Sequence, residues 1–74
     1  MIDLEATGKN IRRLRTEKGV TVRFMQHKLG FATVNAIYKW EKGMCLPTID
    51  NLVILADDIF GCKIDDIIIR KEVV

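Results

Sequence analysis

The segment at residues 29–43, LGFATVNAIYKWEKG, constrains the possible folds of this chain more than any other. Gly30 and Gly43 are expected to end two successive helices, because glycine adopts the left-handed backbone conformation at little cost. The second of these helices, over about residues 33–42, has polar side chains on one side and apolar side chains on the other. A helix this short and this polar is poor core material, so we expect one face to pack and the other to meet a partner.

Caps and apolar spacing predict four more helices, over residues 3–18, 22–29, 48–60 and 64–70. The expected N-caps are Asp3, Thr21, Thr33 and Thr48. The pair Thr7-Gly8 leaves open whether the first helix is interrupted. A chain of 74 residues forms one small domain that buries a limited core. We therefore predict an all-α fold in a single domain.

The apolar positions predict which helix faces pack. In the second helix Met25 and Leu29 are four residues apart and are expected to face inward, with Val22 or Phe24 completing the contact. The clearest amphipathic pattern lies in the fourth helix and consists of Ile49, Leu52, Val53, Ala56, Ile59 and Phe60. The fifth helix is expected to place Ile64, Ile67 and Ile68 on its inner face.

Charge is divided unevenly between the two parts of the chain. Residues 1–43 hold nine Lys and Arg against four Asp and Glu, a net charge of +5, whereas residues 44–74 hold three against six, a net charge of −3. Such a division favours one face for an anionic partner and one face turned away from it. Ordinary solvated helix surface explains the asymmetry equally well, so charge alone leaves both interpretations open.

Several classes of protein are disfavoured. Cys45 and Cys62 lack CxxC spacing, nothing favours a disulfide between them, and two reduced thiols are typical of a cytoplasmic protein. The sequence has no signal-peptide pattern and no apolar run long enough to cross a bilayer, so we expect no membrane partner. The pairs Asp57-Asp58 and Asp65-Asp66 are neighbours that do not face each other on a helix. No catalytic set or metal cluster is apparent, so we expect no enzyme, no cofactor and no small-molecule ligand.

The order of several short motifs resembles a known family. These motifs are GKNIRRLRTEKG (8–19), Thr21, KLG (28–30), IYKWEKG (37–43), LPTIDNLVILADDI (46–59) and KIDDII (63–68). Together they are similar to the lambda-repressor-like, Cro/Xre-type helix-turn-helix domain. The resemblance implies a compact five-helix bundle with the helix-turn-helix at helices 2 and 3, and with helix 3 inserted in the major groove of DNA. It also implies an internal ion pair between Arg15 and Glu41.

The chain departs from the family pattern in three places. Val22 stands where the family often has glutamine. Gln26 stands where a small residue is common, so its side chain is expected to angle outward or to widen the helix crossing. The turn between the two helices, within residues 31–36, is one residue longer than the commonest form.

Within this frame, two groups of residues are candidate DNA contacts. The phosphate contacts are expected to be Thr21, Val22, Arg23, Lys42 and Gly43, with Arg12 or Lys9 adding attraction. The base contacts are expected to be Thr33, Asn35, Tyr38 and Lys39. Alternatives stay open for each: Thr33 serves only as an N-cap, Asn35 is solvated surface, Tyr38 packs over Trp40 or donates to a phosphate, and Lys39 contacts a phosphate. Trp40 itself is expected in the core.

The expected function is sequence-specific binding of double-stranded DNA by a bacterial or phage transcriptional regulator, a repressor that acts as a homodimer. The dimer surface is expected in helix 5 and the tail, at Ile69, Val73 and Val74. The alternative is a protein-interaction module on the same fold, such as an antitoxin or a partner-docking subunit. A third interpretation is that the chain is the DNA-binding fragment of a longer protein.

Overall fold

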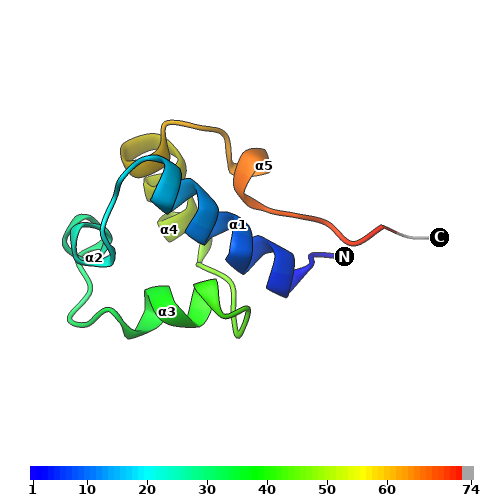
Figure 1. The fold of residues 1–74 in the computed structure, drawn as a ribbon, viewed down its shortest axis with the longest axis horizontal. Helices are drawn as coiled ribbons and strands as arrows, with labels where there is room; N and C mark the ends of the chain where they lie inside the picture. Colours follow the sequence, from blue (N-terminus) through cyan, green and yellow to red (C-terminus); the bar gives the residue numbers. More distant parts are fainter. Residues whose placement is uncertain (73–74) are drawn as a thin grey trace.

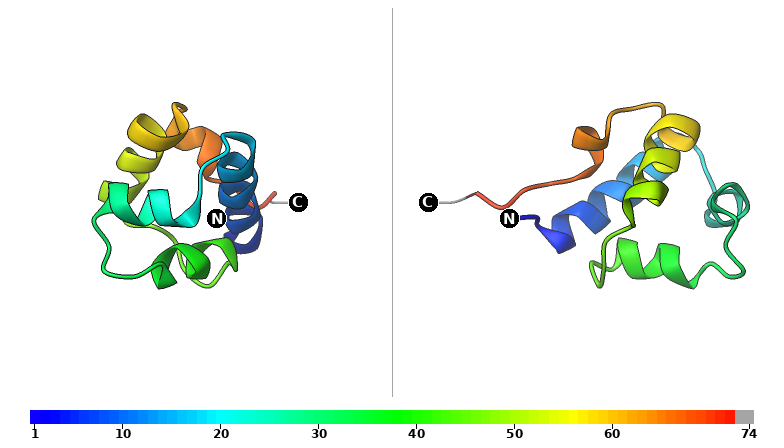
Figure 2. Two further views of the ribbon diagram at one scale, coloured as in Figure 1. Left: turned by 60° about the vertical axis from the view of Figure 1, so that its left-hand side comes forward. Right: turned by 180° about the vertical axis from the view of Figure 1, so that it is seen from behind.

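Helix α1 (Leu4–Glu17) runs across the molecule in Figure 1, and α3 (Asn35–Glu41) and α5 (Ile64–Ile67) pack against it. The computed structural model describes residues 1–72. The elements that follow α1 are α2 (Val22–Leu29), α3 (Asn35–Glu41), α4 (Ile49–Ile54), the π-helix η1 (Leu55–Phe60) and α5 (Ile64–Ile67). Helix α4 continues directly into η1, and together they form the predicted fourth helix. The predicted all-α class and five-helix bundle are confirmed, and Figures 1 and 2 place α3 and α5 on opposite sides of the bundle.

Three of the four predicted N-caps are confirmed by their hydrogen bonds, because each side-chain oxygen accepts from a backbone amide three residues later. These bonds are Ala6 N to Asp3 Oδ1 at 2.9 Å, Phe24 N to Thr21 Oγ1 at 3.0 Å, and Asn51 N to Thr48 Oγ1 at 3.3 Å. The fourth prediction is wrong. Helix α3 starts at Asn35, its N-cap is Val34, and Thr33 Oγ1 accepts from the Asn35 amide only two residues ahead, at 3.3 Å. That spacing belongs to a Ser/Thr turn before the helix rather than to a cap.

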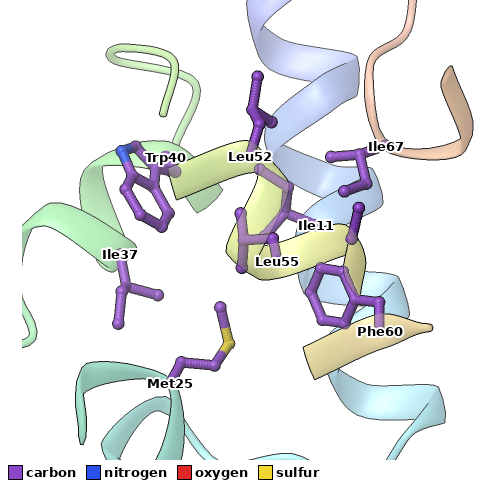
Figure 3. Packing of buried hydrophobic residues seen from close by; sticks show 9 residues of the cluster. Ile11, Met25, Ile37, Trp40, Leu52, Leu55, Phe60 and Ile67 are labelled. Carbon is purple, nitrogen blue, oxygen red and sulfur yellow. The ribbon is translucent and has the colours of Figure 1, made fainter. Parts of the chain in front are cut away.

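The core consists of apolar side chains from every helix (Figure 3). Its nine buried members are Ile11, Met25, Ile37, Trp40, Leu52, Leu55, Ala56, Phe60 and Ile67. Trp40 and Met25 therefore pack inward as the sequence predicted. Leu29 and Val22 are partly buried against this cluster, whereas Phe24 is 45% exposed, so Val22 completes the contact of α2.

The fourth helix buries Leu52, Ala56 and Phe60 of the predicted stripe, and Ile59 packs against the core, but the stripe differs from the prediction at its start. Ile49 and Val53 are 75% and 42% exposed, whereas Leu55 is fully buried. The buried stripe consists of Leu52, Leu55, Ala56 and Phe60. This series follows the i, i+3, i+4 and i+8 spacing of one helix face, so the prediction erred only in including Ile49 and Val53 and in omitting Leu55. Ile64 in α5 was also placed wrongly, since it is 37% exposed.

Helix α5 is shorter than predicted, since it ends at Ile67 instead of residue 70 and the chain continues in extended form. Two buried side chains of α1 cause this ending. Asn10 Nδ2 donates to the carbonyls of Asp66 and Ile67 at 2.7 and 3.0 Å, and Thr7 Oγ1 accepts from Ile69 N at 3.0 Å. The Asn10 bonds occupy two carbonyls and the Thr7 bond occupies the Ile69 amide, groups that another helical turn would use, so the chain leaves the helix and pairs with the N-terminal residues.

Helices α1 and α3 are in backbone contact at Gly8, and α1 passes through Thr7-Gly8 without interruption. A Cβ atom at Gly8 would lie 2.2 Å from Trp40 O and 2.9 Å from Glu41 O. Gly43 follows α3 with a φ of 73°, and a Cβ atom there would lie 2.9 Å from the Cα atom of Glu5. Neither gap admits a methyl group, so the two glycines let the C-terminal end of α3 rest directly on α1.

A side-chain link between the same helices lies beside this contact. Arg15 Nε donates to Glu41 Oε2 at 2.7 Å, and Arg15 Nη2 donates to Glu41 Oε1 at 3.2 Å. The two side chains are only 18% and 6% exposed. The hydrogen bond with Glu41 raises the pKa of Arg15, and the two-point geometry is the strong form of an arginine–carboxylate pair. This ion pair is the one that the family resemblance implied.

We predict that Arg15→Ala lowers the free energy of unfolding by about 3–5 kcal/mol, because it leaves the buried Glu41 carboxylate unpaired. Urea or thermal unfolding followed by circular dichroism measures the loss. The matched control is Lys9→Ala, which removes an exposed pair with Glu5 at 3.4 Å on the same helix. The control should change stability by less than about 0.5 kcal/mol. Equal stability of the two variants would show that the Arg15–Glu41 pair does not hold α3.

We predict that Gly8→Ala destabilises the fold by about 1–3 kcal/mol, because the new methyl group meets backbone atoms of α3 that cannot turn aside. Helix propensity alone predicts the opposite sign, a gain of about 1 kcal/mol. The sign of the change in unfolding free energy therefore decides the matter. A more stable Gly8→Ala variant would mean that the two helices separate easily.

Candidate nucleic-acid interface

Helices α2 and α3 form a helix-turn-helix unit whose inner side is fixed by packing. Gly30 ends α2 with a φ of 72°, and the turn then runs through residues 30–34. Met25 and Ile37 are fully buried beneath the unit. Phe31, in the turn, meets the ring of Trp40 edge to face, with ring centroids 5.6 Å apart. Phe31 is therefore an apolar anchor in the turn, and Ile37 and Trp40 hold α3 from below.

The outer side of α3 carries the predicted base contacts. Asn35, Tyr38 and Lys39 are spaced i, i+3 and i+4, so they share one helix face. All three side chains are exposed, as is Thr33 just before the helix. Tyr38 is 45% exposed, and the aromatic partner of Trp40 is Phe31 rather than Tyr38. The structure therefore brings the four predicted residues together on one surface.

The N-terminal end of α2 lies beside this surface and offers unpaired backbone amides. Thr21 Oγ1 accepts from the Phe24 amide, and Thr21 O accepts from the Met25 amide at 3.1 Å. Within residues 1–72, the amides of Val22 and Arg23 have no hydrogen-bond acceptor. The Val22 side chain packs against the core while the Arg23 side chain is exposed. This end of α2 therefore has the donors and the dipole sign that suit an anion.

At the C-terminal end of α3, the sequence predicted phosphate contacts by Lys42 and Gly43, and the geometry suits only that of Lys42. Lys42 is exposed and lines a surface hollow with Arg12, Arg15 and Tyr38. The predicted phosphate contact of the Gly43 amide is not supported, because that N–H already donates to Trp40 O at 3.0 Å. Gly43 serves instead in the close contact between α3 and α1. The cationic groups at this end are Lys42 and Arg12, and Arg15 is committed to Glu41.

One residue of this region has a role that the sequence did not predict. Gln26 is half-buried, and its Nε2 donates to Phe31 O at 3.2 Å and to Ala32 O at 3.1 Å. The sequence marked Gln26 only as a departure from a small family residue. The sequence does hold one signal for this role, which is a long side chain with an amide donor shortly before the turn. That signal identifies the hydrogen bonds only when the path of the turn is known.

Two further features bear on the kind of site. Within residues 1–72, no three potential metal ligands among His, Cys, Asp and Glu come together. Across the same residues, no helix is both long and apolar enough to cross a bilayer. Cys45 and Cys62 are free thiols. The pKa of Cys62 is raised, mainly by burial of the thiol and to a smaller extent by the nearby Asp66 carboxylate.

Comparisons with known proteins agree with this geometry. A family model described as helix-turn-helix matches residues 11–67. Comparison with curated protein sequences gave no match. Among solved structures, the crystal structure of the DNA-binding domain of BldD superposes with a TM-score of 0.72 and 20% sequence identity, over 90% of this chain and 94% of that chain. At that identity the likeness shows the fold alone. The order of the motifs, the fold and the family match together show that the chain belongs to the lambda-repressor-like, Cro/Xre-type helix-turn-helix family.

Proposed function

We propose that this chain is a transcriptional regulator, specifically a repressor of bacterial or phage type, that binds double-stranded DNA in a sequence-specific manner with α3 in the major groove. The observation that carries the proposal is the exposed face of α3. Within residues 1–72, the side chains of Asn35, Tyr38 and Lys39 make no hydrogen bond or ion pair, although the opposite face is buried. Unpaired polar groups on a rigid, short helix are suited to meet a polar partner.

The chemistry of these side chains matches the edges of bases. Asn35 can pair with adenine through two hydrogen bonds, and Lys39 can donate to the acceptors of guanine. The methyl group of Thr33 can touch the methyl group of thymine, and Tyr38 can donate its hydroxyl to a base or a phosphate. These residues supply the sequence-dependent part of binding.

Phosphate contacts supply orientation and most of the affinity. The free amides of Val22 and Arg23 at the start of α2 are one candidate, with the Arg23 guanidinium beside them. Lys42 and Arg12, at the other end of the unit, are the second. Two phosphate contacts on either side of α3 would fix its direction in the groove.

The family resemblance favours a homodimer on a palindromic site with half-sites about 34 Å apart. Ile69 is the described residue of the expected dimer surface, and it is 36% exposed. Val73 and Val74, which were expected to share this surface, lie outside the described residues. The surface near α5 lies away from α3 (Figure 2), so a dimer formed there leaves both recognition helices accessible.

A second candidate function is protein docking on the same fold. It rests on the exposure of Ile49, Met44 and Val53, which are 75%, 64% and 42% exposed around the start of α4. Recovery of one stoichiometric protein partner, together with no DNA affinity near physiological salt, would favour this function.

Selection from random duplexes tests the leading proposal, and a failure to enrich any sequence would contradict it.

We predict that Asn35→Ala weakens binding to the selected duplex by about 1–3 kcal/mol and relaxes preference at one base pair, because a bidentate contact to that base is lost. Competition gel-shift assays against duplexes with each single base change measure both effects. A uniform loss at all positions would assign Asn35 to the phosphates instead.

We predict that Lys42→Ala weakens binding to selected and unrelated duplexes alike and reduces the slope of log affinity against log salt by about 1. The matched control is Lys63→Ala, which removes an exposed lysine at the start of α5, on the far side of the bundle. Its binding should equal that of the wild type. If both variants lose affinity to the same extent, Lys42 acts only through net charge.

A further inference from the structure

The turn between α2 and α3 has two backbone carbonyls that depend on one side chain. Within residues 1–72, the carbonyls of Phe31 and Ala32 accept no backbone hydrogen bond. Both accept from Nε2 of Gln26, at 3.2 and 3.1 Å. A primary amide has two N–H groups, so the donor capacity of this side chain is fully used. The backbone carbonyl of Gln26 also accepts from Phe31 N at 3.1 Å, so one residue holds the turn at three points.

The start of α3 lacks a side-chain cap. Its N-cap, Val34, makes no side-chain capping bond, and the Thr33 hydroxyl reaches only the amide of Asn35. The C-terminal end of α3 is fixed against α1, whereas its N-terminal end is held by the packing of Ala36 and Ile37 and, ahead of them, through the turn. The direction in which Thr33 and Asn35 project therefore depends on how firmly the turn is held.

Gln26 lies where it can act on both groups of proposed DNA contacts. It lines a surface hollow together with Val22, Arg23, Thr33 and Tyr38. Because both of its N–H groups donate within the protein, it has no amide donor left for DNA. Its position and its bonding point to a role through the turn instead of through direct contact.

We propose that Gln26 is a positioning residue for base readout, whose carboxamide clamps the lengthened turn and so sets the direction of the first residues of α3. The proposal rests on the proposed function, DNA binding through α3. It also explains why a long polar residue is compatible with a position where the family commonly has a small one. The turn of this chain has two carbonyls to satisfy, and the long side chain of Gln26 satisfies them.

The first arm of the test uses the free protein and involves no DNA. Gln26→Met keeps the length of the side chain and removes both donors, and His27→Met is the matched control at the next, exposed position. Amide hydrogen exchange measured by NMR should be at least about threefold faster at Phe31 and Asn35 in Gln26→Met, because the turn opens more often. Exchange in α1 should be unchanged, which separates a local effect from global destabilisation.

The second arm measures binding of the same three proteins to a duplex selected with the wild type and to an unrelated duplex. Gln26→Met should bind the selected duplex roughly tenfold more weakly, since one misplaced bidentate contact costs about that much. Its affinity for the unrelated duplex should remain within about twofold of the wild type, because the phosphate contacts at α2 and Lys42 are intact. His27→Met should match the wild type in both measurements.

The outcomes separate the two proposals. Exchange at Phe31 and Asn35 that is unchanged in Gln26→Met overturns the positioning role, whatever the DNA arm shows. Faster exchange with an unchanged ratio of selected to unrelated affinity also overturns it, because the turn then does not control readout. If the wild-type protein enriches no sequence from random duplexes, that result alone overturns the proposed function, and the readout role of Gln26 falls with it. Faster exchange together with a lowered affinity ratio supports the inference.

Discussion

The close contact between α1 and α3 is the constraint on which the rest of the structure depends. Gly8 removes the side chain that would separate the two backbones, and the Arg15–Glu41 pair connects the helices within the same contact. Because α1 is the longest helix and contacts the extended segment after α5, it gives α3 a rigid support. Recognition by side chains on a helix of seven residues requires such support, since a helix of this length is unstable in isolation.

The same contact resolves an electrostatic conflict. Glu41 is an acid at the end of a helix proposed to face a polyanion, next to the cationic Lys42. Its carboxylate is nearly buried and binds Arg15 at two points, so its charge is compensated within the protein. Lys42 remains exposed and free to attract phosphate. Burial of an ion pair costs desolvation, and here that cost accompanies the removal of a repulsive charge from the proposed interface.

Most features of the fold that could be predicted from the sequence depend on neighbouring residues, and several of the missed features depend on distant ones. The caps at Thr21 and Thr48 involve amides three residues away, so local chemistry predicts them. The end of α5 was missed because Asn10, more than fifty residues earlier, occupies its carbonyls. The sequence left open a helix break at Gly8, because the backbone that packs against this glycine belongs to α3, more than thirty residues away. In the site, the exposed face of α3 followed from periodicity, whereas the bonding of Gln26 required the path of the turn.

The two ends of α3 are held by different means. At the C-terminal end, backbone contact and a buried ion pair leave little freedom, and any displacement there would strain the core. At the N-terminal end, Ile37 is buried, but the residues before it are held by the edge-to-face contact of Phe31 and by the hydrogen bonds of Gln26, which are partly exposed to water. Such bonds open more easily than core packing. The fixed end therefore defines where the helix lies, and the turn governs how its first residues point. On the proposed function, a change in this turn would alter the base preference of this chain without a change in the fold.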